Sequence, residues 1–387
     1  MLSIVKGPYL QWPTPHTVTV MWETSEPADS KVMVWQAERI HSGYLGNYKQ
    51  PEQVVQTVHL KESTVIHRIT LEGLAPSTVY HYQVHSSHEH DNVASGKFFL
   101  KTAVQRGTPF SLAVTSETGG YSGFDTSEGQ INRNVFHHMR RYRPDFALFV
   151  GDIVNDGHNV EDWERYFFLP GKELLSDTPF YCCLGNHENH SPWFHRFFAY
   201  PPPSRFYAFD YGDARFICLD STELIDNDTY PLDSGKMAPG HEQFDFLVRA
   251  LEESDARWKI VFFHYPPYVS GGYQVEALRA LSPVLEQHGV DLVLNSHTIA
   301  YERSHPIRDG GIDYENGIVY VVAGGAGAMP SWLLPKREWH TAQSLAVPHF
   351  LHVVITPHTL ELQAIDDEGR LFDRFGFYKD VSGKRYF

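Results

Sequence analysis

The chain has 387 residues, of which 42% are hydrophobic and 20% charged, enough for two or three globular domains with full cores. Its formal net charge of −15 at pH 7 repels phosphate backbones at long range and argues against general nucleic-acid binding. The first residues, MLSIVKGPYL, lack the apolar core of a signal peptide, and no apolar run is long enough to span a membrane. The sequence therefore predicts a soluble, cytoplasmic protein without membrane contact.

Residues 1–103 have the pattern of an all-β domain. Apolar and polar residues alternate in His16–Glu23, and strand patterns continue in Lys31–Trp35 and Val54–Leu60. His67–Val84 then runs from a strand through a proline turn to tyrosines that can close a tyrosine corner. This stretch resembles a fibronectin type III domain, and the residues that carry the resemblance are Trp22, Leu74, Pro76, Thr78, Tyr80 and Tyr82. We expect these side chains to pack a core and to perform no chemistry.

The segment Lys101–Pro109 is typical of a linker, and after it strands alternate with helices. Apolar side chains at helical spacing predict three helices, over Ser127–Arg141, Glu242–Leu251 and Val275–His288. Turn residues between strand patterns predict a hairpin and a C-terminal antiparallel region, over Phe206–Asp220 and His349–Phe375.

Five short apolar runs in this α/β part each end in a residue that can bind a metal. They are Ser111–Gly120, Ala147–Asp156, Tyr181–His190, Val261–Pro267 and Leu292–Arg303. Such runs are typical of buried parallel strands, and in open α/β sheets ligands bind beyond the carboxyl ends of the strands. Carboxylate, amide and imidazole donors suit borderline or hard divalent metals. The donors expected to meet at this edge are Glu117, Asp152, Asn186, His187, His264 and His297.

Taken in order, these strand ends resemble the metallophosphoesterase family and, within it, the purple acid phosphatases. The resemblance rests on Gly185–Glu188 (GNHE), His264–Tyr268 (HYPPY) and Tyr301–Arg303 (YER). It implies a fibronectin type III-like, purple acid phosphatase N-terminal domain over residues 1–103. It further implies a four-layer α/β/β/α calcineurin-like metallophosphoesterase domain over residues 104–387. The activity it implies is metal-dependent hydrolysis of a phosphate mono- or diester in a small phosphorylated substrate.

The resemblance also implies roles for the site residues. Asp152 would bridge two metals, and Asn186, His264 and His297 would complete the second metal site. Two cations clamp the attacking and leaving oxygens of a phosphate ester and lower the pKa of a bound water. His187 would contact phosphate or protonate the leaving group, a task that suits histidine because its pKa lies near neutrality.

The first metal site departs from the family pattern. Glu117 stands where the family has aspartate, Asn155 where it has tyrosine and Ile299 where it has histidine. One ligand is therefore lengthened, one is weakened and one is lost, whereas the second site keeps all four residues. We expect one divalent ion (Zn, Mn or Fe) at the second site, with Glu117 and Asn155 as ligands of a second, weaker ion.

The sequence is also compatible with other hypotheses about function. The protein could be a mononuclear or catalytically reduced relative that acts on a non-standard substrate, or a binding scaffold that keeps the fold. Four donors that flank the motifs could also rebuild the first site; they are Asp156, His158, Glu188 and His190. Substrate identity and oligomeric state do not follow from the sequence.

Overall fold

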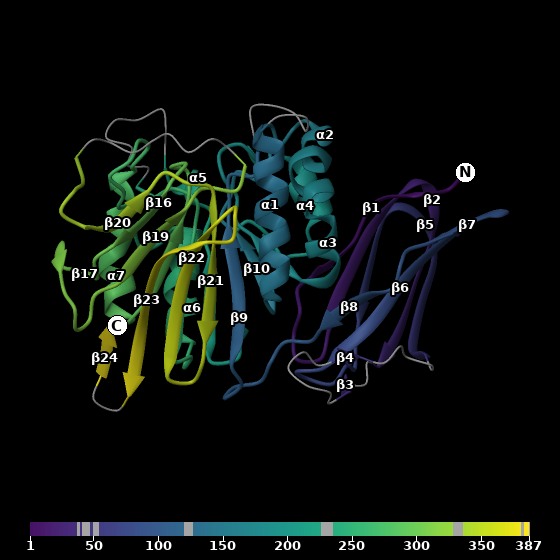
Figure 1. Ribbon diagram of the computed structural model, residues 1–387, viewed down its shortest axis with the longest axis horizontal. Helices are drawn as coiled ribbons and strands as arrows, with labels where there is room; N and C mark the ends of the chain where they lie inside the picture. The colour runs from purple at the N-terminus through teal and green to yellow at the C-terminus, as the bar shows by residue number, and fades with distance from the viewer. Residues whose placement is uncertain are drawn as a thin grey trace.

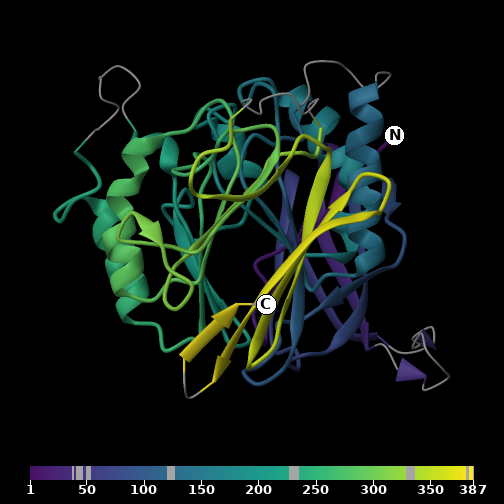
Figure 2. The ribbon, with the colours of Figure 1, turned by 60° about the vertical axis from the view of Figure 1, so that its left-hand side comes forward.

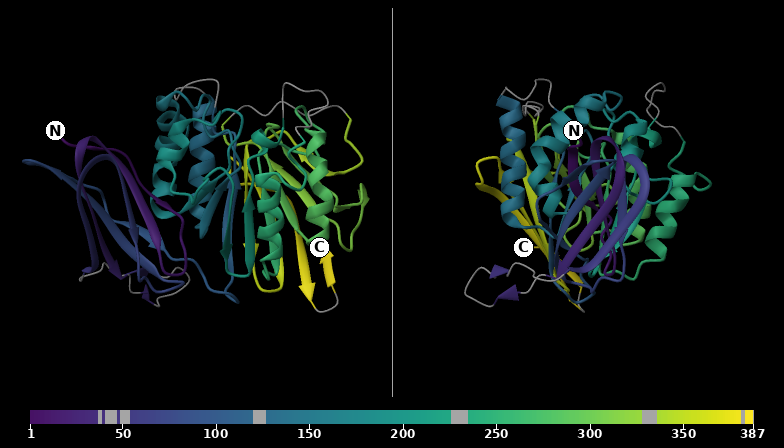
Figure 3. Two further views of the ribbon diagram at one scale, coloured as in Figure 1. Left: turned by 180° about the vertical axis from the view of Figure 1, so that it is seen from behind. Right: turned by 90° about the vertical axis from the view of Figure 1, so that its right-hand side faces the viewer.

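The computed structural model describes residues 1–36, 39–40, 47–48, 54–119, 127–225, 235–327, 336–380 and 383–386. An N-terminal lobe of strands lies beside a larger part in which helices flank two sheets (Figure 1). The N-terminus lies on the β lobe and the C-terminus on the far side of the larger part, as two further views show (Figure 3). Among the described residues, no helix has the length and apolar character needed to cross a membrane.

Strands alone build the described part of the N-terminal lobe. They are β1 (Ile4–Gln11), β2 (Val18–Gln36), β3 (Arg39–Ile40), β4 (Asn47–Tyr48), β5 (Val54–Leu71), β6 (Val79–His88), β7 (Asp91–Ala94) and β8 (Phe98–Lys101). The two patterns predicted as separate strands within 16–35 form one long strand, β2, whose pairing with β5 shifts register between Glu23 and Ala28. Pro27 lies in this irregular stretch, since a proline has no N–H for a regular ladder.

The lobe has its own apolar core. Trp22, Leu74, Tyr80 and Tyr82 all belong to this cluster, as the resemblance to a fibronectin type III domain predicts. The hydroxyl of Tyr80 accepts a hydrogen bond from the N–H of Ala75 at 2.9 Å, which is the contact of a tyrosine corner. The lobe therefore packs as a structural unit, and the domain boundary proposed between residues 103 and 104 lies in the segment that separates β8 from β9.

Two sheets form the centre of the larger part. The first sheet has the order β24-β23-β22-β21-β9-β10-β11, with β9, β10 and β11 parallel, and it meets the N-terminal lobe where Phe180 of β11 pairs with Gln11 of β1. Its strands are β9 (Phe110–Thr115), β10 (Phe146–Phe149), β11 (Phe180–Cys182), β21 (His349–Ile355), β22 (Thr359–Asp366), β23 (Leu371–Asp380) and β24 (Gly383–Tyr386). The predicted antiparallel C-terminal region is thus confirmed and extends this sheet.

The second sheet has the order β12-β13-β14-β15-β19-β16-β20, and β13, β14, β15 and β19 are parallel. Its strands are β12 (Tyr207–Tyr211), β13 (Ala214–Cys218), β14 (Trp258–Phe262), β15 (Leu292–Asn295), β16 (Tyr301–Ser304), β19 (Val319–Ala323) and β20 (Thr341–Leu345). The predicted hairpin is β12 with β13. A small two-stranded ladder stands apart, formed by β17 (Ile307–Arg308) and β18 (Gly311–Ile312).

Helices cover the outer faces of both sheets and complete the four layers that the family resemblance implied (Figure 2). The helical segments are α1 (Ser127–Tyr142), α2 (Val160–Asp162), η1 (Trp163–Phe168), α3 (Leu169–Asp177), α4 (Pro192–Phe197), α5 (Ser221–Leu224), α6 (Glu242–Glu252), η2 (Glu276–Leu281) and α7 (Ser282–Gln287). The segment predicted as one helix over 275–288 divides into η2 and α7. Pro283 lies in the first turn of α7, where its missing N–H has no intrahelical partner to lose.

Aromatic side chains fill the space between the two sheets. Tyr181 of β11 stacks on Phe209 of β12 with ring centroids 3.8 Å apart. Phe146 of β10 meets Phe216 of β13 edge to face at 5.3 Å. Such pairs contribute about 0.5–1.5 kcal/mol each beyond the burial of their area. This packing fixes one sheet against the other, and with them the loops that follow their strands.

Candidate metal centre

All five apolar runs form strands, and the predicted donors follow the strand ends. The donors after β9, β10, β11, β14 and β15 are, in this order, Glu117, Asp152, Asn186 with His187, His264 and His297. Three of them form a tight group, since the ligand atoms of Asp152, His264 and His297 all lie within 4.8 Å of one another. The structure therefore brings together residues of both sheets that are far apart in the sequence.

The ring of His264 is oriented by hydrogen bonds on both sides. Its Nδ1 lies 2.8 Å from the carbonyl oxygen of Val150, which can only accept, so Nδ1 carries the proton. Its Nε2 then points to Asp152 Oδ2 at 3.0 Å and to Asn186 Oδ1 at 3.2 Å. A backbone carbonyl behind the ring is the usual way in which proteins fix a metal-binding histidine.

Aromatic rings enclose His297. Its ring centroid lies 5.1 Å from that of His264, 4.6 Å from that of Tyr265 and 5.0 Å from that of Tyr273. Burial and the charge of His264 lower the pKa of His297 to about 3. Its imidazole is therefore neutral near pH 7, the form that binds a metal.

Asp152 and His264 perturb each other electrostatically. Burial favours a raised pKa for the Asp152 carboxyl, but the charge and hydrogen bond of His264 outweigh it and hold this pKa below its ordinary value. Burial likewise favours a lowered pKa for His264, but the charge of Asp152 outweighs it and raises the pKa to about 9. Without a cation, the buried carboxylate is thus neutralised by the imidazolium next to it.

The backbone is strained at these strand ends. Glu117, Asp152 and His297 have φ angles of 56°, 51° and 66°, in the left-handed region that side chains disfavour by roughly 1–2 kcal/mol per residue. Gly151 has a φ of 85°, and a Cβ there would lie 2.6 Å from His264 Nδ1. A Cβ on Gly185 would lie 2.2 Å from Asp152 Oδ1. Glycine is therefore required at both positions so that the two loops can approach His264 and Asp152.

The donor set fits one divalent cation. Nitrogen and oxygen ligands lie about 2.0–2.2 Å from a zinc ion, so ligands of one ion are at most about 4.4 Å apart. The group around Asp152, with its 4.8 Å limit, has nearly this spacing, and Asn186 Oδ1 adds a fourth donor beside His264. One carboxylate, one amide and two imidazoles suit zinc, manganese or iron.

His187 lies beside this group rather than in it. Its Nδ1 lies 2.6 Å from the carbonyl oxygen of Asn155, so Nδ1 carries a proton, and its Nε2 lies 3.9 Å from Asp152 Oδ2. The side chain is 33% exposed, which leaves it accessible to a small molecule at the metal group. Burial favours a lowered pKa, but the charge of Asp152 outweighs it and raises the pKa of His187. A protonated imidazole at this place can attract phosphate or donate a proton.

Glu117, which was predicted for the first metal site, has other partners. Glu117 Oε1 accepts hydrogen bonds from Ser296 Oγ at 2.7 Å and from the N–H of His297 at 2.8 Å. Burial and the charge of Asp152 raise the pKa of Glu117 to about 7. Ile299 is buried, and its apolar side chain stands where the family has histidine. Glu117 is thus next to the metal group without belonging to it.

The four flanking donors do not join the metal group either. Asp156 accepts a hydrogen bond from the N–H of His158, and the ring of His158 bonds the carbonyl of Asn189. His190 faces Asp220, in an arrangement described further below. Among the described residues, none of these side chains belongs to the cluster of possible ligands.

Glu188 has a role that the sequence analysis missed. Its fully buried carboxylate accepts hydrogen bonds from the N–H groups of Asp152, Ile153 and Gly185 at 2.9, 2.8 and 2.6 Å. It therefore ties the loop after β10 to the loop after β11. Backbone N–H groups beyond the end of a strand have no partner in the sheet, and an acidic residue close behind such an end was the available signal.

Two family models match the chain. The model for the calcineurin-like phosphoesterase covers residues 112–301, and the model for the purple acid phosphatase N-terminal domain covers residues 5–102. The fold and the matches define a metallophosphoesterase with two domains. More particularly, the chain combines a calcineurin-like phosphoesterase domain with a purple acid phosphatase N-terminal domain, as the motifs predicted, and its relatives with this combination are named as acid phosphatases, which are metal-dependent phosphoric ester hydrolases.

Individual relatives agree with this assignment. The chain is 24% identical to a purple acid phosphatase of Glycine max, over 81% of this chain and 70% of that protein. It is 26% identical to acid phosphatase type 7 of Mus musculus, over 96% of this chain and 90% of that protein. The solved structure of purple acid phosphatase PPD1 from yellow lupin, Lupinus luteus, has a TM-score of 0.78 at 18% identity, covering 97% of this chain and 75% of the other. This likeness supports the same fold.

Proposed function

We propose that the protein hydrolyses a phosphate ester with one divalent ion held by Asp152, Asn186, His264 and His297. The observation that carries the proposal is the spacing of Asp152, His264 and His297, whose ligand atoms lie within 4.8 Å of one another, with Asn186 Oδ1 beside His264. Membership of the metallophosphoesterases supports phosphoester hydrolysis in general. The proposed substrate is a small phosphorylated molecule.

When bound, a divalent ion supplies a water of lowered pKa and neutralises part of the phosphate charge. Asp152 and His264 hold their positions before binding, because each is oriented by a backbone group. Asp152 Oδ1 accepts a hydrogen bond from the N–H of His187 in the next loop of the same sheet, and His264 donates to the carbonyl of Val150, which follows a strand of the other sheet. His187 presents Nε2 next to the group and, when protonated, can place a proton on the leaving oxygen. Its Nδ1–H stays on the Asn155 carbonyl, which keeps the ring facing the substrate.

For the first site we propose a second ion that is bound weakly, with Glu117 and Asn155 as its candidate ligands. Two observations support weak binding. Glu117 Oε1 already accepts two hydrogen bonds, from Ser296 and His297, which leaves mainly Oε2 for a metal. Ile299 offers no donor where a ligand is expected.

The experiment is a titration of metal-depleted protein with zinc, manganese and iron, combined with turnover of 4-nitrophenyl phosphate and bis(4-nitrophenyl) phosphate. The proposal predicts one tight ion and turnover of at least one ester. Activity that survives exhaustive chelation would contradict it. A metal-loaded protein that turns over neither ester, and that behaves as His187→Ala and Asp152→Ala do, would favour the binding scaffold.

A further inference from the structure

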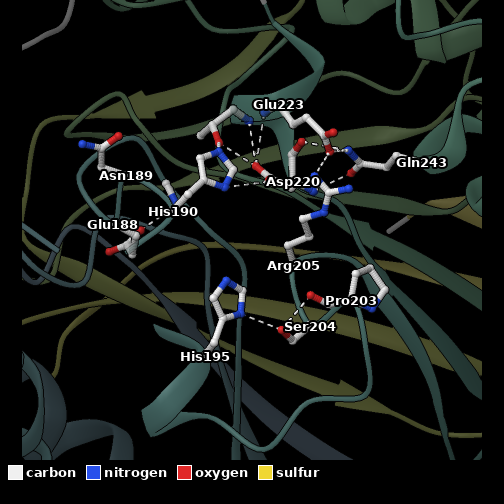
Figure 4. Close-up of polar contacts among 12 residues, drawn as sticks. Glu188, Asn189, His190, His195, Pro203, Ser204, Arg205, Asp220, Glu223 and Gln243 are labelled. Carbon is white, nitrogen blue, oxygen red and sulfur yellow. Dashed lines mark hydrogen bonds and ion pairs between the residues drawn. The ribbon is translucent and has the colours of Figure 1, made fainter. Parts of the chain in front are cut away.

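A second polar cluster surrounds Asp220 and includes His190, which follows the predicted donors Asn186 and His187 in the chain (Figure 4). Asp220 follows β13 and is fully buried. Its Oδ1 accepts hydrogen bonds from the N–H and hydroxyl of Thr222 at 3.1 and 2.6 Å and from the N–H of Glu223 at 3.3 Å. Within the part of the chain that the structure describes, its Oδ2 accepts no hydrogen bond, and it faces the Nδ1 of His190 at 3.6 Å.

His190 is held in this cluster from two sides. Its Nε2 lies 3.2 Å from the hydroxyl oxygen of Thr222. Because that hydroxyl donates its single proton to Asp220, the oxygen accepts from His190, so Nε2 carries a proton. Nδ1 faces Asp220 Oδ2 at 3.6 Å, which is longer than a hydrogen bond, so the hydrogen-bonded link from the ring to Asp220 runs through Thr222.

His190 ends the loop that carries Asn186 and His187, and this loop follows a strand of the first sheet. Asn189 and His190 have φ angles of 46° and 48°, two consecutive left-handed residues that the surroundings must hold in place. The contact with Asp220 reaches the second sheet, as does that of Asn186 with His264. The two contacts together fix the loop across the gap between the sheets.

We propose that His190 is a positioning residue for the metal centre: held by Asp220 and Thr222, it fixes the loop so that Asn186 and His187 face the ions and the substrate. The inference rests on the metal site proposed above. The physical reason is that Asn186 and His187 come from the first sheet, whereas His264 comes from the second. The distance between the two halves of the ligand set therefore depends on contacts that join them, and the His190–Asp220 pair is one.

The test compares zinc affinity and turnover of 4-nitrophenyl phosphate in His190→Ala, Asp220→Asn and the double variant. Asparagine keeps the volume of Asp220 and its capping of the next backbone turn, so this variant tests the contact without removing the cap. Mutation of a group that orients a metal ligand typically lowers metal affinity by about 10–100-fold. We expect each single variant to weaken zinc binding about tenfold, at the lower end of this range. The double variant should lose no more than either single one, because both remove the same contact.

The matched control is His195→Ala, another partly exposed histidine nearby, whose ring bonds Ser204 outside this cluster (Figure 4). It should keep wild-type zinc affinity. Wild-type affinity and turnover in both single variants would overturn the inference, and so would losses that multiply in the double variant. Lowered thermal stability with unchanged zinc affinity would show a merely structural contact and would also overturn it. A wild-type protein that binds no zinc would instead refute the proposed function. That outcome is measured on the wild type alone, so it is distinct from the outcomes that concern the variants.

Discussion

The side chains of Asp152 and His264 lie 3.0 Å apart although they belong to different sheets. Each is held by the backbone of a neighbouring loop, Asp152 Oδ1 by the N–H of His187 at 2.9 Å and His264 Nδ1 by the carbonyl of Val150 at 2.8 Å. The pair is therefore already oriented without a cation. This arrangement makes Asp152 the centre of the predicted ligand set.

Asp152→Asn should abolish tight metal binding. The substitution keeps the shape of the side chain but removes the charge that faces His264 and His297. Mutation of a residue that only orients a metal ligand lowers metal affinity by roughly 10–100-fold, and we expect a larger fall in zinc affinity here because Asp152 is itself a ligand. Calorimetric titration measures this, with Asp156→Asn as the control from the same loop. Equal losses in the two variants would contradict the assignment.

His187→Ala should slow turnover and leave zinc affinity nearly unchanged, because the ring lies beside the ligand group. Loss of a general acid costs about 10²–10⁴-fold in rate. If His187 protonates the leaving group, the loss is larger for an alkyl phosphate than for 4-nitrophenyl phosphate, whose leaving group needs no proton. Steady-state kinetics with both esters measures the ratio. An unchanged kcat for both esters would refute any role of His187 in the reaction.

Glu188→Gln should destabilise the fold. The carboxylate accepts three backbone N–H groups, and an amide keeps only one oxygen for them. A buried donor left without a partner costs about 1–3 kcal/mol, so we expect the free energy of unfolding to fall by about that amount. Urea denaturation measures it. The exposed Glu161→Gln serves as control and should change stability by less than about 0.5 kcal/mol. A Glu188→Gln protein as stable as the control would argue against the tie between the two loops.

The N-terminal lobe should lose stability in mild acid because of His67. This ring is fully buried, stacks on Trp22 with centroids 4.7 Å apart, and bonds the hydroxyls of Ser30 and Thr24 at 2.7 and 2.8 Å. Burial lowers the pKa of His67 to about 4, against the attraction of Asp29. Between about pH 6.5 and pH 4, His67 therefore binds a proton in the unfolded chain but not in the folded one.

Stability linked to His67 is thus fully present above about pH 6.5 and is lost as the pH falls toward 4, by about 3 kcal/mol in total. Urea denaturation between pH 7 and pH 4 measures the slope. His67→Gln should flatten it, whereas the exposed His90→Gln should not. Equal slopes in wild type and His67→Gln would contradict this account.

The sequence predicted those features that depend on local pattern. Apolar runs that end in turn residues identified the five strands, and parallel pairing predicted that strand ends of one sheet lie at one edge. The five strands in fact divide between two sheets, so Asp152 meets His264 and His297 only through the packing of one sheet against the other. Contacts that depend on tertiary proximity were not predictable in this way. The hydrogen bonds by which Glu188 ties two loops together, and the pairing of His190 with Asp220, both depend on residues that are distant in the sequence. Only the tertiary packing brings these residues together.

The most direct test of the central claim is anomalous X-ray diffraction from crystals of the zinc-loaded protein, with elemental analysis of the same sample. The account predicts one strong peak enclosed by Asp152, Asn186, His264 and His297, and about one ion per chain. Two peaks of equal strength at full occupancy would contradict the weak first site. A protein that takes up no ion, or binds it away from these four residues, would contradict the metal centre itself.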